Sequence, residues 1–199
     1  MNDLDLLLDA LRKAGEVAMG FHGKNPKRWN KPDGTVLTEA DLAVDACLKA
    51  IICTARPDDG WLSEETPDTP ERLTRKRLWI ADPIDGTRAF ADATRFWGIG
   101  VALVEDGAPI LSGIYCPVDD VLFLAVKDGG AFRNGVRLTL GPSDGPAIIP
   151  KSAKTSVEAL GLSTQISSNW PMLLRFALVA EGQNAAAISI GFKQDWDLA

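Results

Sequence analysis

Residues 97–140 hold the feature that most constrains the fold, a run of short apolar segments separated by turn signals. Asp106-Gly107 and Asn134-Gly135 are typical of tight β-hairpin turns. Asp119-Asp120 and Lys127–Gly130 mark two more turns. The expected strands between these turns are Trp97–Val104, Ile110–Pro117, Val121–Val126, Ala131–Arg133 and Val136–Leu140. The segment therefore predicts an antiparallel meander, in which the aspartates act as turn formers and not as ligands.

Two amphipathic helices are expected before the meander. Leucine and alanine recur at helical spacing over Asp3–Phe21. A second helix, roughly Glu39–Thr54, follows a Thr-x-x-Asp pattern that fits a capping box. Between them, Lys24–Gly34 is a basic, polar loop. A solvated loop is the favoured interpretation, and the alternative is a mobile segment that approaches an active site and a phosphate.

Gly141–Pro150 is rich in proline, glycine and serine and predicts a subdomain boundary. It separates an N-terminal α+β subdomain, residues 1–140, from a C-terminal α/β subdomain, residues 141–199. The elements expected beyond it are a helix over Ser156–Leu160, a polar stretch over Ser163–Asn169, a helix over Pro171–Gly182 and a strand over Ala185–Ile190. The last residues, Asp195–Ala199, look like the first turn of a helix that has been cut off.

Composition excludes several classes of protein. The chain has 199 residues, 46% of them hydrophobic, and a formal charge of −6. An acidic chain of this kind is not expected to bind nucleic-acid polymers or anionic membranes. No apolar run approaches the ~18 residues of a membrane span, and the acidic N-terminus has no basic signal region. Three cysteines without metal-type spacing predict buried free thiols, and we expect a cytoplasmic protein.

The motif Asp82-Pro83-Ile84-Asp85-Gly86-Thr87 follows an apolar strand, Leu78–Ala81. A turn at the end of that strand presents two carboxylates at its carboxyl edge. If a helical turn starts there, the backbone N–H groups of Gly86 and Thr87 are available to an anion. Carboxylates beside free N–H groups can hold a hard cation and a phosphate together.

Other acids have two interpretations from the residues alone. Asp41 is either only a helix-start carboxylate, which is favoured, or a group that reaches the central motif. Glu64 and Glu65 follow a short strand, Trp61–Ser63, and form either a solvated rim or a further carboxylate for a metal. His22, the only histidine, lies in a helix exit turn and is given no role, so no nucleophilic triad is expected.

With these pieces in order, the chain resembles the inositol monophosphatase-like family of Mg²⁺-dependent, lithium-sensitive phosphatases, which includes bacterial 3'(2'),5'-bisphosphate nucleotidases. Four motifs carry the resemblance: Thr38-Glu39-Ala40-Asp41, Ser63-Glu64-Glu65, Asp82-Pro83-Ile84-Asp85-Gly86-Thr87 and Trp196-Asp197. Members usually carry glycine in place of Ser63. The resemblance implies an α/β (α+β) fold, a layered α/β/α/β/α sandwich of the sugar-phosphatase type. Because members continue well past the Trp-Asp motif, it also implies that the chain is truncated at its C-terminus.

The resemblance further implies a role for each matching residue. Glu65, Asp82 and the Ile84 carbonyl would hold one Mg²⁺, and Asp82, Asp85 and Asp197 a second, with a third held more weakly through Glu65. Asp41 and Thr87 would form a pair that, with Glu65, orients and deprotonates the attacking water. The expected substrate contacts are Asp85, Gly86, Thr87, Ser189 and Asp197. Li⁺ is expected to inhibit, and the protein to be a homodimer.

The sequence gives fewer indications of the substrate than of the metal ligands. In inositol phosphatases a glutamate before the Trp-Asp motif contacts the sugar alcohol, and alignment on Gly191 puts Ser189 at that position. Inositol monophosphate is the expected substrate, and adenosine 3',5'-bisphosphate is the alternative. Lys193 and the Lys24–Lys31 loop are candidates to meet a second phosphate. An alternative of a different class is a non-catalytic module that binds metal or phosphate.

Overall fold

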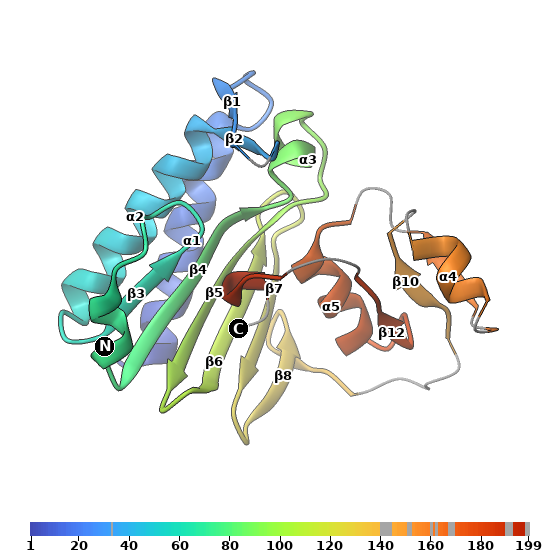
Figure 1. Ribbon diagram of the computed structural model, residues 1–199. Helices are drawn as coiled ribbons and strands as arrows, with labels where there is room; N and C mark the ends of the chain where they lie inside the picture. The colour runs from blue at the N-terminus through green and yellow to red at the C-terminus, as the bar shows by residue number, and fades with distance from the viewer. Residues whose placement is uncertain are drawn as a thin grey trace.

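The fold has five layers, in the order α/β/α/β/α, as the sequence predicted (Figure 1). The computed structural model describes residues 1–32, 34–139, 145–150, 153–159, 161, 163–166, 170–189 and 193–197. Helices α1 and α2 cover one face of a large sheet, and α5 lies on its other face. A small sheet and α4 complete the stack beyond α5.

The large sheet has seven strands in the order β3-β4-β5-β6-β7-β8-β9. Their bounds are β3 Gly60–Ser63, β4 Arg77–Asp85, β5 Gly98–Glu105, β6 Ala108–Cys116, β7 Val121–Val126, β8 Gly130–Arg133 and β9 Val136–Arg137. All neighbouring pairs from β4 to β9 are antiparallel, which confirms the predicted meander. The pair β3–β4 is parallel. The 3₁₀ helix η1, Pro70–Thr74, lies in the connection between these two strands.

The two long helices form where capping and periodicity predict them. Helix α1, Asp3–Phe21, begins with the Asn2 side chain accepting from the Asp5 N–H. Helix α2, Glu39–Ala55, begins with the predicted capping box between Thr38 and Asp41. Their apolar faces pack on β4 and β5 in one core, with fully buried side chains such as Leu11, Leu48 and Trp79.

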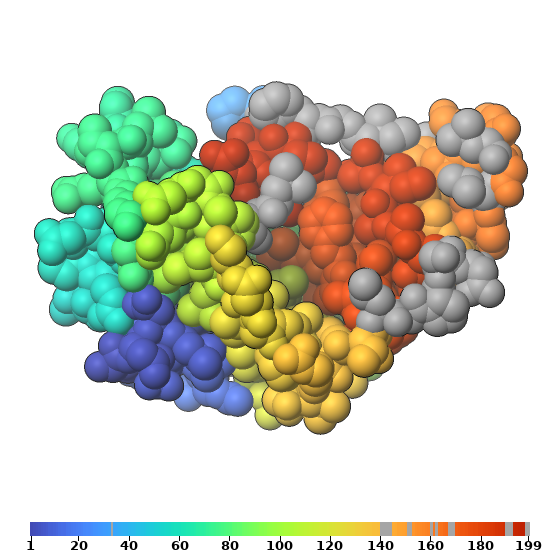
Figure 2. Space-filling model, turned by 90° about the horizontal axis from the view of Figure 1, so that it is seen from below, coloured from blue at the N-terminus to red at the C-terminus, as the bar shows by residue number. Residues whose placement is uncertain are grey.

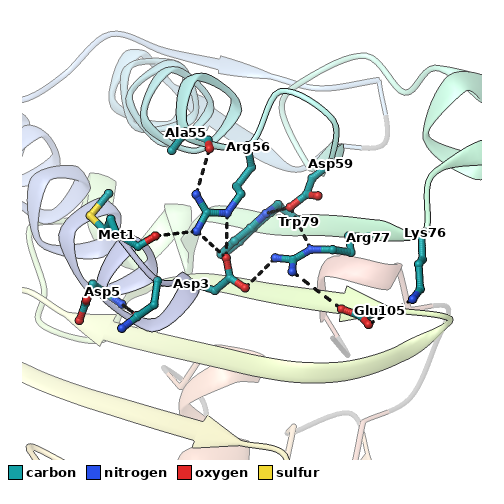
Figure 3. A network of polar contacts seen from close by, with 11 residues as sticks. Met1, Asp3, Asp5, Ala55, Arg56, Asp59, Lys76, Arg77, Trp79 and Glu105 are labelled. Carbon is teal, nitrogen blue, oxygen red and sulfur yellow. Dashed lines mark hydrogen bonds and ion pairs between the residues drawn. The ribbon is translucent and has the colours of Figure 1, made fainter.

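An ion network joins the start of α1 to the end of α2 and the start of β4 (Figure 3). Asp3 accepts from Arg56 Nε at 2.8 Å and from Arg77 NH2 at 2.7 Å. Arg77 also lies 3.3 Å from Asp59, whose carboxylate accepts from the Trp79 indole at 2.9 Å. The network therefore holds α1, α2 and β4 together at the end of the sheet opposite the carboxyl end of β4.

The second part of the chain supplies the outer layers. Helix α5 spans Met172–Ala180, and a three-stranded parallel sheet has the order β11-β10-β12. The bounds are β10 Ala147–Ile149, α4 Lys154–Glu158, β11 Thr164–Ile166 and β12 Ala186–Ala187. The orange and red residues of this part lie together on one side of the molecule in Figure 2. The division at residues 140 and 141 stays a prediction.

Several short elements differ from the sequence predictions. The loop at Lys24–Gly34 contains β1, Arg28–Asn30, which pairs antiparallel with β2, Val36–Thr38. The predicted break at Gly141–Pro150 contains β10, and the predicted polar stretch at Ser163–Asn169 contains β11. These strands have three residues each, too few for a local pattern to reveal them, and each depends on pairing with another strand.

Parts of other predictions lie outside the described residues. They concern Asp33, the stretch 140–144, Leu160, residues 167–169, Ile190 to Phe192 and the last two residues. Of the three free cysteines, only Cys116 is buried, so the expectation of buried thiols is wrong for the half-buried Cys47 and Cys53. Among the described residues, no helix has the length and apolar character needed to cross a membrane.

Candidate active site

The parallel pairing of β3 and β4 brings two acidic segments to one edge of the sheet. Ser63, the last residue of β3, is in register with Ala81 of β4. The strand β3 leads into Glu64 and Glu65, and β4 ends with Asp82 and Asp85. The carboxyl ends of parallel strands meet at the same edge. Residues that are about 20 apart in sequence therefore lie at one site.

Strand β4 is longer than predicted and runs through the central motif to Asp85. Asp82 pairs with Gly100 and Asp85 with Gly98, with an irregularity between them. Pro83 has no N–H for the ladder, which explains the interruption. Gly86 follows with φ +94°, and helix α3, Thr87–Ala91, starts after it, which meets the condition stated for free N–H groups at Gly86 and Thr87. Gly100 leaves the space that Leu173 of α5 fills, since an added Cβ would clash with Leu173 Cδ1.

A pocket with a volume of about 750 Å³ opens at this edge. Its lining includes acids from three segments: Glu64, then Asp82 and Asp85, then Asp197 of the 3₁₀ helix η3, Asp195–Asp197. Ile84, Gly86 and Thr87 line it as well. The lining thus includes residues of three of the four sequence motifs, while the predicted catalytic residues Asp41 and Glu65 are not part of it.

Asp41 serves both roles that the sequence left open. Its Oδ2 atom accepts from the Thr38 backbone N–H at 2.8 Å, which completes the capping box. Its Oδ1 atom accepts from the Thr87 hydroxyl at 2.9 Å, so a buried helix-start carboxylate also reaches the central motif. The preference for a purely structural Asp41, which came from the residues alone, is therefore wrong. Burial raises the pKa of Asp41, against the hydrogen bonds from Thr38 and Thr87.

Lys31 enters the site, so the preferred interpretation of its loop as merely solvated is wrong. Its ammonium lies 2.7 Å from Glu64 Oε1 and 2.8 Å from Glu65 Oε1. Only 6% of the Glu65 side chain is exposed, and this burial raises the pKa of Glu65 to about 7, against the hydrogen bond from Lys31. Burial disfavours the charge of Lys31, but its hydrogen bonds to both glutamates outweigh this and raise its pKa.

Asp82 and Asp85 are the most deeply placed acids of the pocket. Burial, and then the neighbouring charge of Asp85, raises the pKa of Asp82. Asp82 Oδ1 is buried and has no hydrogen-bond partner among the described residues. Burial also raises the pKa of Asp85 to about 7, although its Oδ2 atom accepts from the Leu173 N–H at 2.6 Å. An unpartnered carboxylate oxygen is costly unless a cation joins it.

The residues fit a hard divalent cation by chemistry. The donors are carboxylates and one backbone carbonyl, the oxygen ligands that Mg²⁺ prefers. The unpartnered Asp82 oxygen points to a missing positive charge. Within the described ranges, no three Asp, Glu, His or Cys side chains already form a set suited to a metal ion.

The predicted substrate contact at Ser189 is not among the residues that line this pocket. Gly191, on which its assignment was aligned, lies outside the described residues. Lys193 is half-buried and also absent from the lining.

Arg175 of α5 is a residue that sequence reasoning missed. Its NH1 atom lies 3.5 Å from the carbonyl of Ile188, and its Nε atom is buried without a partner among the described residues. Burial lowers the pKa of Arg175, while the nearby charges of Asp85 and Asp197 oppose this change. Arg175 is not among the residues that line the pocket, so it acts on Asp85 and Asp197 through its charge. Its position in α5 carries no motif, so only the folded chain reveals it.

Acids that meet at the end of a parallel strand pair, in a fold layered in this way, are characteristic of phosphatases of the sugar-phosphatase type. A sequence model of the inositol monophosphatase family matches residues 4–199, and the chain belongs to that family. It is accordingly a phosphoric monoester hydrolase of the inositol monophosphatase type, as the four motifs predicted.

Two curated relatives are similar over nearly the whole chain. A histidinol-phosphatase of Chlorobaculum parvum is 31% identical over 99% of this chain and 80% of its own length. The 3'(2'),5'-bisphosphate nucleotidase CysQ of Escherichia coli K12 is 32% identical over 98% of this chain and 84% of its own. Relatives of different substrate specificity thus lie at equal distance, and the comparison leaves the substrate open.

A solved structure supports the fold. An IMPase/NADP phosphatase complexed with Mg²⁺ and phosphate superposes with a TM-score of 0.86 over 98% of this chain and 76% of that chain. The two sequences are 23% identical, so this likeness speaks for the fold.

Proposed function

We propose that the protein is a Mg²⁺-dependent phosphomonoesterase that hydrolyses a small phosphorylated metabolite by an activated water. The observation that carries the proposal is the unpartnered, buried Oδ1 atom of Asp82 in a pocket of acids. Such a pocket needs a cation, and a cation beside the start of α3 attracts a phosphate. The family membership of the chain agrees with this reading.

We propose that two or three Mg²⁺ ions are held by the residues that the motifs predicted. Glu65, Asp82 and the Ile84 carbonyl would hold one ion, and Asp82, Asp85 and Asp197 a second, with Glu65 also serving a weaker third. Bound ions of this kind lower the pKa of a water and neutralise developing phosphate charge. Li⁺ is proposed to inhibit by competing for these ligands.

Side chains of the protein are proposed to orient the attacking water and to accept its proton. The Thr87 hydroxyl lies 2.9 Å from Asp41 Oδ1 and 3.0 Å from the Ile84 carbonyl oxygen, and we propose that it donates to Asp41, which leaves the lone pairs of Thr87 Oγ1 for a water. We propose that a water hydrogen-bonded to Thr87 Oγ1 is oriented there, and that Glu65 accepts its proton. Asp85, Gly86 and Thr87 would contact the phosphate ester. Phosphoryl transfer depends mainly on such positioning and on charge neutralisation.

Arg175 favours one substrate class among the candidates. The expected substrate, inositol monophosphate, has only one phosphate, and Ser189 provides no carboxylate for its hydroxyl groups. Arg175 does not line the pocket, but its positive charge near Asp85 and Asp197 makes the site more favourable to a substrate with a second anionic group. It is unsuited to a cationic one such as histidinol phosphate. We therefore rank adenosine 3',5'-bisphosphate, the former alternative, above inositol monophosphate.

Steady-state kinetics on three substrates test both levels of the proposal. Inositol 1-phosphate, adenosine 3',5'-bisphosphate and histidinol phosphate are compared with Mg²⁺ and with EDTA. Turnover of at least one substrate that EDTA abolishes is expected, and its absence on every phosphomonoester would refute the enzyme. The highest kcat/KM is expected for the bisphosphate, with a loss of about tenfold in Arg175→Gln confined to that substrate. An equal loss on all three would remove Arg175 from substrate selection.

We also propose that the protein acts in the cytoplasm, from its cysteine usage, and that it is a homodimer, on the resemblance alone. Light scattering coupled to size-exclusion chromatography measures the mass directly, and a monomer at micromolar concentration would refute the dimer. Two other statements do not depend on the oligomeric state: that the substrate is small and phosphorylated, and that no helix of the described residues could span a membrane.

A further inference from the structure

Helix α2 carries a second buried carboxylate, one turn beyond Asp41. Asp45 is 8% exposed, and its Oδ2 atom accepts from the Thr66 hydroxyl at 2.6 Å. Thr66 directly follows Glu65 in the chain. The indole Nε1 of Trp61 lies 3.4 Å from the same hydroxyl oxygen. Asp45 therefore anchors the segment that carries Glu65, although it does not line the pocket itself.

The two carboxylates of α2 make matching contacts. Asp41 accepts from Thr87, which is two residues beyond Asp85, and Asp45 accepts from Thr66, next to Glu65. Residues four apart share a helix face and are separated by about 6 Å along the axis. Together with the parallel pairing of β3 and β4, helix α2 therefore helps to fix the segment after β3 relative to the segment after β4.

The burial of Asp45 needs a physical explanation. Its Oδ1 atom is buried without a hydrogen-bond partner among the described residues. Burying a carboxylate in this way disfavours folding unless another gain offsets it. The geometry points to positioning as that gain, because the one strong contact of the carboxylate holds the residue after Glu65.

We propose that Asp45, through Thr66, is a positioning residue that holds Glu65 toward Asp41 and Thr87. This inference rests on the proposed function, since it assigns Asp45 a part in arranging the same site. Asp45 touches no reacting atom. Its effect is to preorganise the Glu65 carboxylate, and supporting hydrogen bonds behind a metal ligand typically change affinity by about 10–100-fold.

Mg²⁺ affinity measured by calorimetry tests the proposal without relying on turnover. Asp45→Ala and Thr66→Val are each expected to weaken Mg²⁺ binding by about tenfold. The double variant is expected to be no weaker than either single one, because both remove one contact. Asp45→Asn and Thr66→Ser keep an acceptor and a donor and are expected to bind within about twofold of the wild type.

A matched control separates positioning from general destabilisation. Asp59 is also a largely buried acid, and it accepts from the Trp79 indole at 2.9 Å in the network remote from the pocket. Asp59→Ala is expected to lower the melting temperature while leaving Mg²⁺ affinity unchanged. Affinity in Asp45→Ala equal to the wild type, or an equal loss in Asp59→Ala, would overturn the inference.

The outcomes remain distinct from those of the proposed function. Wild-type protein that binds Mg²⁺ but hydrolyses no phosphomonoester refutes the enzyme, while the affinity series still tests Asp45. If Asp45→Ala does not fold, Thr66→Val provides the test, because Thr66 is only half-buried. Unchanged Mg²⁺ affinity in Thr66→Val overturns the positioning role.

Discussion

Gly86 offers the sharpest test of how the central motif is built, because two separate penalties meet at one position. Its φ of +94° lies in the left-handed region, where an L-residue costs about 1–2 kcal/mol. An added Cβ would also lie 2.9 Å from the Phe96 carbonyl oxygen and 3.1 Å from Pro171 Cγ. Overpacking of this kind typically costs about 1–3 kcal/mol. Gly86→Ala is therefore expected to lose about 2–5 kcal/mol of unfolding free energy.

Gly107→Ala is the matched control for this perturbation. Gly107 has φ +79° in the β5–β6 turn, and nothing lies within 4 Å of an added Cβ. It is expected to lose only the backbone part, about 1–2 kcal/mol. Urea unfolding of both variants, fitted with a common slope, measures the difference. Losses that agree within ~0.5 kcal/mol would refute the steric argument.

The same variant has a consequence at the site. Pro171 precedes α5, whose Leu173 N–H bonds to Asp85. A methyl group that displaces Pro171 is expected to shift this hydrogen bond and to lower kcat with Mg²⁺. Gly107→Ala is expected to keep the wild-type kcat, since its turn lies at the opposite end of β5 from Gly98.

Three further predictions concern charge. The raised pKa of Asp82 means that its ionised form disfavours the metal-free fold at neutral pH. Asp82→Asn should therefore raise the melting temperature in EDTA and lose Mg²⁺-dependent turnover. The gain in melting temperature should vanish near pH 4, where Asp82 of the unfolded state also protonates. Burial opposes ionisation of Asp3, but hydrogen bonds from Arg77 and Arg56 outweigh it and lower its pKa. Asp3→Asn should therefore lose about 1–3 kcal/mol of unfolding free energy at pH 7. The difference from the wild type should shrink as pH falls below about 4. Lys31→Met should bind Mg²⁺ more tightly by calorimetry, because no ammonium has to leave Glu64 and Glu65, and weaker binding would contradict that reading.

The sequence predicted the elements whose signals are local. Helix α1 has the predicted bounds, because its apolar spacing and its cap are both in the chain. The meander followed from its turn residues. By contrast, Arg28–Asn30 and Thr164–Ile166 are short and become strands only because other strands pair with them. Their structure is a property of the assembled fold, which local propensity does not report.

The same distinction between local and non-local signals applies to the residues of the candidate site. Asp82, Asp85 and Thr87 stand in one motif, and their proximity needs little more than the strand that carries them. Lys31 and Arg175 have no motif, and their approach to the acids depends on a loop and on a helix of a different layer. Spacing in the chain carries no information about that approach.

The order of the strands in the large sheet has a consequence for synthesis. From β3 to β9, every strand pairs with the strand that precedes it in the chain. Such a ladder can grow as the polypeptide leaves the ribosome, one neighbour at a time. The hydrogen bond between Leu173 and Asp85 joins residues 88 apart and has to wait for α5. An emerging chain can therefore assemble the β3 and β4 edge of the pocket first and close it only when the later helix arrives.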